Sequence, residues 1–79
     1  MEMNTQDYLK KALLDTQEKV RDFMMYAEHV DDKELSKCFR DFAKTEGLQA
    51  QTLQKHIDSL FLVNIFLLDW LFKSINMFL

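Results

Sequence analysis

The chain has 79 residues with no proline, one glycine and 48% apolar residues, which predicts one small domain built almost wholly of helix. Thirteen acidic and ten basic side chains are interspersed and give a net charge of −3, so no nucleic-acid partner is expected. The single Cys38 excludes a disulfide framework within the chain and a CxxC zinc site, and it favours a reducing, cytoplasmic location.

The first predicted helix runs from about residue 4 to residue 29. Its stripe of core positions recurs in alternating steps of four and three residues, at Leu9, Leu13, Thr16, Val20, Phe23, Ala27 and Val30. Asn4 or Thr5 is the expected N-cap, and Asp7 lies in the first turn, where the helix dipole favours an acidic side chain.

The run "HVDDKEL" interrupts this stripe and predicts a turn, with Asp31 or Asp32 as the cap of a second helix. We place the stripe of that helix at Leu35, Phe39, Phe42, Glu46, Gln49, Leu53, His56 or Ile57, and Leu60. A short loop between two such stripes predicts an antiparallel helical hairpin. The second helix either runs on or breaks at Asp58 and Ser59, which could cap a third helix. We therefore divide the single domain into an amphipathic hairpin, residues 1–58, and an apolar helix or helical extension, residues 59–79.

Residues 60–79 contain 15 apolar side chains and only two charged ones, Asp69 and Lys73. The segment is long enough to cross a bilayer, but Asp69 near its centre costs about 3 kcal/mol for insertion. Asp69, Lys73 and Asn76 share one helical face, which leaves the other faces free to pack on protein. Because so small a core is marginal alone, we expect this helix to lie in the core of a homo-oligomer, a dimer or larger. A membrane anchor formed by residues 60–79 is the alternative.

Four polar residues, Thr16, Glu46, Gln49 and His56, fall on the predicted inward stripes. An unpaired carboxylate at such a position costs several kcal/mol, so Glu46 must be paired, protonated, hydrated or bound to metal. A helix presents side chains at i and i+3 together, and carboxylate and imidazole are hard or borderline ligands, so metal ligation by Glu46 is one interpretation. The structural alternative is that Glu46 forms hydrogen bonds with Gln49, Thr16 or another copy of the chain.

The segment "YAEHVDDKELSKCFRDFAKTEGLQAQTLQKHI" resembles the second half of a rubrerythrin-type or encapsulated-ferritin-type hairpin of the ferritin-like superfamily. In those families one helix carries an inward glutamate, its partner carries Glu-x-x-His, and two hairpins enclose two irons. Over roughly residues 8–57 the resemblance places Glu46 on the motif glutamate, Gln49 on the motif histidine and Thr16 at or beside the other glutamate. It implies a ferritin-like bundle with a degenerate metal site, because an amide and a hydroxyl are weaker ligands than imidazole and carboxylate.

Other catalytic patterns are absent from the sequence, including a glycine-rich phosphate loop, a GxSxG elbow and a cysteine–histidine pair at helical spacing. We therefore expect a non-catalytic, ferritin-like oligomeric helical protein without a cofactor, in which the former metal site has become a polar layer. Two alternatives stay open. One is a protein that binds iron or another divalent metal, of ferroxidase or storage type, with its site at a dimer interface. The other is a small membrane-anchored helical protein.

Overall fold

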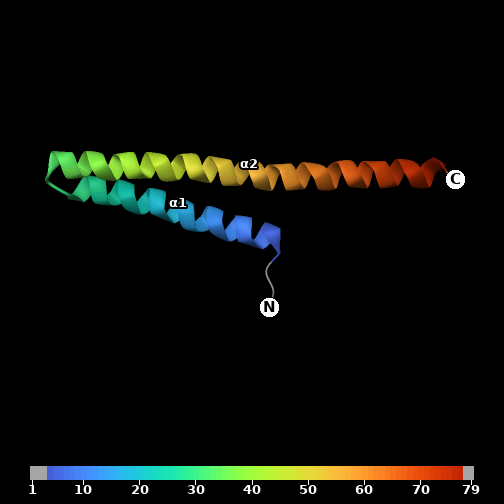
Figure 1. Cartoon of the computed structure of the whole chain (residues 1–79), viewed down its shortest axis with the longest axis horizontal. Coiled ribbons are helices and arrows are strands. Elements are labelled where there is room, and N and C mark those ends of the chain that lie inside the picture. Colours follow the sequence, from blue (N-terminus) through green and yellow to red (C-terminus); the bar gives the residue numbers. More distant parts are fainter. Residues whose placement is uncertain (1–3, 78–79) are drawn as a thin grey trace.

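The computed structural model describes residues 4–77 and contains, over that range, two helices and no strand. Helix α1 spans Thr5–His29 and helix α2 spans Lys33–Met77, and the two run antiparallel as a hairpin (Figure 1). The predicted all-α hairpin is confirmed at this level. The ends of the two predicted segments, residues 1–3 and 78–79, lie outside the described residues.

Side chains set the start of each helix. The Asn4 Oδ1 atom accepts from the Asp7 N–H at 2.9 Å, and the Asn4 N–H donates to the Asp7 carboxylate at 3.4 Å, which completes a capping box. At the start of α2 the Leu35 N–H donates to Asp32 Oδ1 at 3.0 Å. Asn4 and Asp32 are thus the caps, each one of the two candidates that the sequence offered.

The two helices meet along a stripe of positions that we call the seam. On α1 the seam consists of Gln6, Leu9, Leu13, Thr16, Val20, Phe23, Ala27 and Val30, all buried or half-buried. On α2 it consists of Ser36, Phe39, Ala43, Glu46, Ala50, Leu53, Ile57 and Leu60, also buried or half-buried. Both series alternate steps of three and four residues, the spacing of an antiparallel coiled coil.

The α2 stripe predicted from the sequence was wrong at three of its eight positions. Leu35, Phe42 and Gln49 are exposed, and the seam passes instead through the residue that follows each of them. At the position left open between His56 and Ile57, Ile57 lies in the seam and His56 is exposed. The residues that replace the three wrong ones are Ser36, Ala43 and Ala50, whose small side chains let the two backbones approach closely. The prediction favoured large side chains, whereas the hairpin puts small ones at the contact and large ones at its flank.

An aromatic cluster holds the hairpin near its turn. The Phe23 ring lies 6.2 Å from the Phe39 ring, 5.6 Å from Phe42 and 6.3 Å from Tyr26, centroid to centroid. The Tyr26 and Phe39 rings are 5.5 Å apart in an edge-to-face arrangement. Ala27, which is 3% exposed, belongs to the same end of the hairpin. Such ring pairs add stability beyond the apolar area that they bury, so the cluster joins α1 to α2 near the turn.

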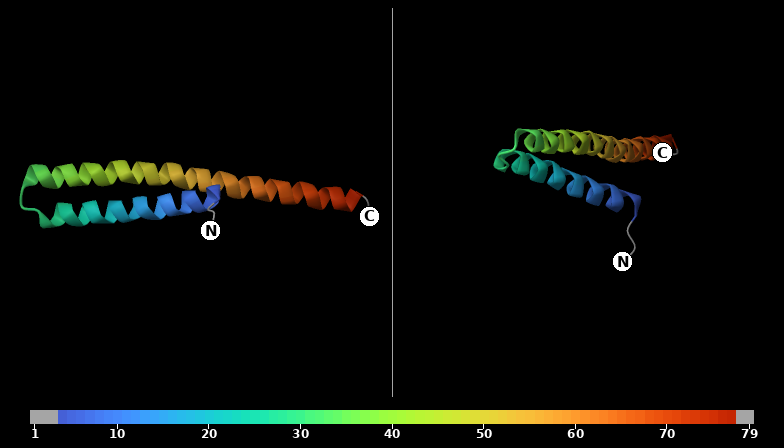
Figure 2. Two further views of the ribbon diagram at one scale, coloured as in Figure 1. Left: turned by 60° about the horizontal axis from the view of Figure 1, so that its bottom comes forward. Right: turned by 60° about the vertical axis from the view of Figure 1, so that its left-hand side comes forward.

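Helix α2 passes through Asp58 and Ser59 without a break and extends well beyond the start of α1 (Figures 1 and 2). We call residues 61–77 the overhang. The molecule measures 71 × 26 × 13 Å, and its radius of gyration of 19.8 Å compares with about 12 Å for a compact domain of this length. No large side chain is fully buried among the described residues. The single chain is therefore a rod with very little core.

The chain exposes 6936 Å² of surface, whereas a compact monomer of its mass exposes about 5,000 Å², an excess of about 1,900 Å². In the overhang, every side chain from Phe61 to Lys73 is exposed. The Lys73 and Asp69 side chains pair at 3.2 Å on one face of this helix. The remaining faces are almost wholly apolar.

A second exposed ion pair joins the Lys11 Nζ atom to the Asp15 carboxylate at 2.9 Å. The hydrogen bond to Asp15, and secondarily its charge, raise the pKa of Lys11 above its ordinary value. Because both side chains are largely exposed, water and salt screen the pair and it contributes little to stability.

Candidate functional site

The structure brings two of the three predicted site residues to the contact between the helices. Thr16 and Glu46 lie in the seam and are half-buried, whereas Gln49 is exposed outside it. The Thr16 hydroxyl donates to the Ala12 carbonyl at 2.7 Å, so its one proton is used within α1. Glu46 thus keeps the predicted inward position, and Gln49 lies on an outer face of α2.

The metal-binding capacity of this arrangement is small within one chain. Among residues 4–77 no group of three or more histidine, cysteine, aspartate or glutamate side chains is placed to hold a metal ion. Glu46 offers one carboxylate, and Thr16 offers only a hydroxyl oxygen, a poor ligand for a divalent cation. A metal site on Glu46 would therefore need further carboxylates from another copy of the chain.

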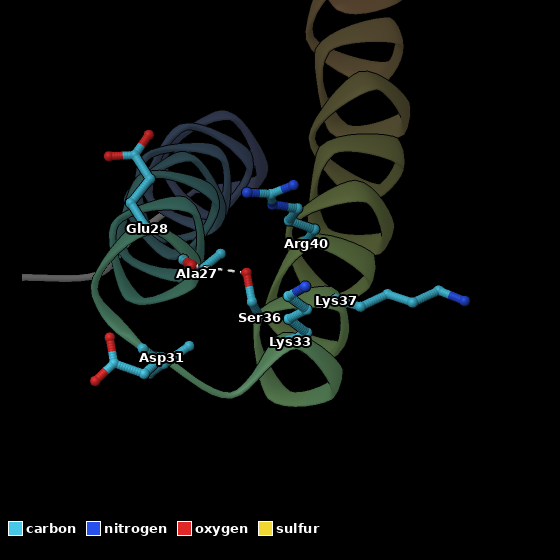
Figure 3. Close-up of a pocket in the computed structure, with 8 residues that line it drawn as sticks. Ala27, Glu28, Asp31, Lys33, Ser36, Lys37 and Arg40 are labelled. Carbon is cyan, nitrogen blue, oxygen red and sulfur yellow. Dashed lines mark hydrogen bonds between the residues drawn. The ribbon is translucent and has the colours of Figure 1, made fainter.

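An open hollow of about 520 Å³ lies beside the turn, between the end of α1 and the start of α2 (Figure 3). Lys33, Lys37 and Arg40 line it from α2, and Glu28 and Asp31 line it from the other side. In Figure 3 the Arg40 side chain points toward α1, while the two carboxylates point away from α2. The hollow is open to solvent, and the Lys37 ammonium group points away from α1 (Figure 3).

The hydroxyl in this hollow serves the turn. Ser36 Oγ donates to the Ala27 carbonyl at 2.7 Å, across the turn from α2 to α1 (Figure 3). The Ala27 carbonyl belongs to the last turn of α1, where carbonyls have no partner inside the helix. No histidine or cysteine is among the residues that line the hollow, so Ser36 has no neighbouring base to activate it. The hydrogen bond is a structural tie between the two helices.

The overhang is a candidate interaction surface, because its apolar side chains are exposed. Leu67, Trp70 and Phe72 are 54%, 62% and 65% exposed, and their neighbours are similar. The sequence also left open a membrane-crossing tail formed by residues 60–79. Within the part of the chain that the structure describes, no helix combines the length and the apolar character needed to cross a membrane.

Comparison with known proteins adds no relative on which the site could be tested. No protein-family model, no curated protein and no solved structure matches this chain. The resemblance to ferritin-like hairpins therefore stays a prediction from the sequence.

Proposed function

We propose that the chain is a non-catalytic, homo-oligomeric helical protein of ferritin-like type, whose role is to form a helical assembly. The observation that carries this proposal is the apolar surface left uncovered by the hairpin. Thirteen consecutive side chains of the overhang, Phe61 to Lys73, are exposed, and the apolar Phe61, Leu68 and Trp70 among them are 62–65% exposed. Monomeric soluble proteins rarely leave contiguous apolar patches larger than a few hundred Å² open to water.

The polar positions of the seam fit the same proposal. Between Gln6, at the open end of the hairpin, and the turn, Thr16 and Glu46 interrupt a contact of apolar and small residues, and polar residues in such a contact can select one register of packing over others. In this proposal they are what is left of a ferritin-like metal site and act as a polar layer. The single Cys38, exposed and unpaired within the described residues, fits the cytoplasmic location that belongs to the proposal.

The molar mass in solution tests the assembly directly. We expect sedimentation equilibrium between about 1 and 100 μM chain to give a dimer or a larger closed oligomer, since burial of the overhang is a strong driving force. A helical chain that stays monomeric over this whole range would contradict the proposed function.

The second candidate function is binding of iron or another divalent metal at an interface between copies, with Glu46 from each chain as the ligand. The half-buried place of Glu46 in the seam is the observation that favours it. The non-catalytic proposal predicts that anaerobic titration with ferrous iron gives no saturable uptake at micromolar concentrations, and no oxidation when air is admitted.

The matched control for this titration is Glu46→Gln, which keeps the size and polarity of the side chain and removes its charge. If the native chain took up iron saturably and E46Q did not, the metal-binding alternative would replace the non-catalytic proposal. The solution mass of both proteins must be the same for this comparison to hold.

A further inference from the structure

The seam of α2 continues past the level at which α1 begins. Up to Leu60 its positions face α1, and the same alternation of three and four residues continues through Asn64, Leu67, Leu71 and Ser74. We call these four positions the overhang seam. No other part of residues 4–77 lies beside them, because α2 extends beyond the start of α1 (Figure 1). Half of a coiled-coil contact is thus present without the helix that would complete it.

The residues that flank the seam change character at the same point. In the hairpin one flank of the α2 seam consists of Arg40, Gly47 and Gln54, and the opposite flank passes from Leu35 and Phe42 to the polar Gln49 and His56. In the overhang the equivalent flank consists of Phe61, Leu68 and Ile75, and the opposite flank includes Val63 and Trp70. All five of these apolar side chains are about 60% exposed or more. Polar residues beside a helix–helix contact face solvent, whereas apolar residues there widen the surface that a second helix can cover.

We propose that the overhang of a second copy of this chain covers the overhang seam, running antiparallel, with Asn64 of each copy opposite Ser74 of the other. Leu67 of each copy then lies opposite Leu71 of the other. This inference rests on the self-assembly proposed above and specifies its geometry. The polar residues of the overhang seam pair with each other and the leucines pair with each other, so no amide or hydroxyl is buried against leucine.

The place of α1 decides the antiparallel direction. Because the seam is continuous, α1 occupies the same side of α2 on which the overhang seam faces. A second copy running parallel would bring its own α1 to the same end, and two α1 helices would then separate the α2 helices. Packed helix axes lie about 8–10 Å apart, a distance at which the overhangs could not meet in that arrangement. In the antiparallel arrangement the two hairpins lie at opposite ends.

The length of α1 decides the register. Each helix has eight seam positions in the hairpin, so Gln6 on α1 is level with Leu60 on α2, and α1 starts at Thr5. With Asn64 opposite Ser74, the α2 helix of the second copy ends just where α1 begins, and the second copy prolongs the line of α1. One heptad of further overlap would drive Ser74 of the second copy into the place that α1 occupies beside Ile57. One heptad less would place Leu71 of each copy opposite Ser74 of the other and so bury a hydroxyl against leucine.

Crosslinking between single-cysteine variants tests this pairing. In a C38S background, which removes the one native cysteine, N64C and S74C are prepared separately and also refolded together as a mixture. Each is treated with a bis-maleimide whose span is below about two helical turns, or about 11 Å. We expect the mixture to give a crosslinked N64C–S74C dimer, and each variant alone to give at least tenfold less. In the proposed register two copies of residue 74 lie ten residues apart along the axis, about 15 Å.

The outcomes separate this inference from the proposed function. Efficient crosslinking of S74C or N64C to itself would overturn the antiparallel register. An oligomer in sedimentation that gives no N64C–S74C product would overturn the pairing and leave the proposed assembly standing. A monomer would overturn both. Asn64 is exposed and Ser74 nearly matches cysteine in size, so both variants keep the hairpin, which circular dichroism verifies.

Discussion

Replacing Leu67 with aspartate is expected to convert the assembled protein into monomers. In the proposed pairing Leu67 lies in the middle of the interface, so L67D would bury a carboxylate without a partner in each copy. Such burial costs several kcal/mol, and each 1.4 kcal/mol weakens association about tenfold. With two copies of the change in every pair, the dissociation constant should rise by at least about 100-fold, as measured by sedimentation over a concentration series.

The matched control is L62D in the same helix. Leu62 is 50% exposed in the single chain and Leu67 is 54% exposed, so the two substitutions differ little in their effect on the isolated helix. Leu62 lies next to the face that carries Asp69 and Lys73, away from the overhang seam. We expect L62D to keep its oligomeric state within a few-fold of the native dissociation constant. Equal weakening by both substitutions would mean that the overhang associates through no particular face.

The helices themselves could be predicted from local chemistry. The predicted stripe of α1 from Leu9 to Val30 was correct at every position. The start of α1 was predictable because the Asn4 side chain caps the helix by accepting from the N–H of Asp7, three residues later. Such signals act over one or two turns and therefore show in the sequence. The continuity of α2 through Asp58 could not be decided in this way, because both residues at the possible break can cap a helix or continue one.

The contact face of α2 was harder to predict because two phases, that is, two neighbouring faces of the helix, fit its apolar pattern. The two phases share Phe39, Glu46, Leu53 and Leu60. They differ at the positions between these residues, where the predicted phase has Phe42 and Gln49 and the observed phase has Ala43 and Ala50. Hydrophobicity favours the first set, and close approach of the backbones favours the second. This phase also decides the candidate site, since Gln49 belongs to the set that turned out to be exposed. Only the position of α1, a tertiary contact, distinguishes the two.

Replacing Phe23 with alanine is expected to cause the largest loss of hairpin stability from any single side chain. Phe23 contacts three other rings, at 5.6–6.3 Å between centroids, and joins α1 to Phe39 and Phe42 on α2. Loss of a fully buried phenylalanine costs about 3–5 kcal/mol. Since this ring is half-buried, we expect F23A to lower the free energy of unfolding by about 2–4 kcal/mol.

Urea unfolding followed by circular dichroism measures this change, at one fixed chain concentration because assembly itself stabilises the fold. The control is Y8A, since Tyr8 is an aromatic residue of the same helix that lies outside the seam and is 60% exposed. Both variants change an aromatic residue to alanine in α1, so the helix propensity gained is similar and cancels in the comparison. Y8A should alter stability by no more than about 0.5 kcal/mol. If F23A and Y8A shifted the midpoint equally, the aromatic cluster would not be what joins α1 to α2. The small-residue contact at Ala27 and Ala43 would then have to hold the hairpin by itself.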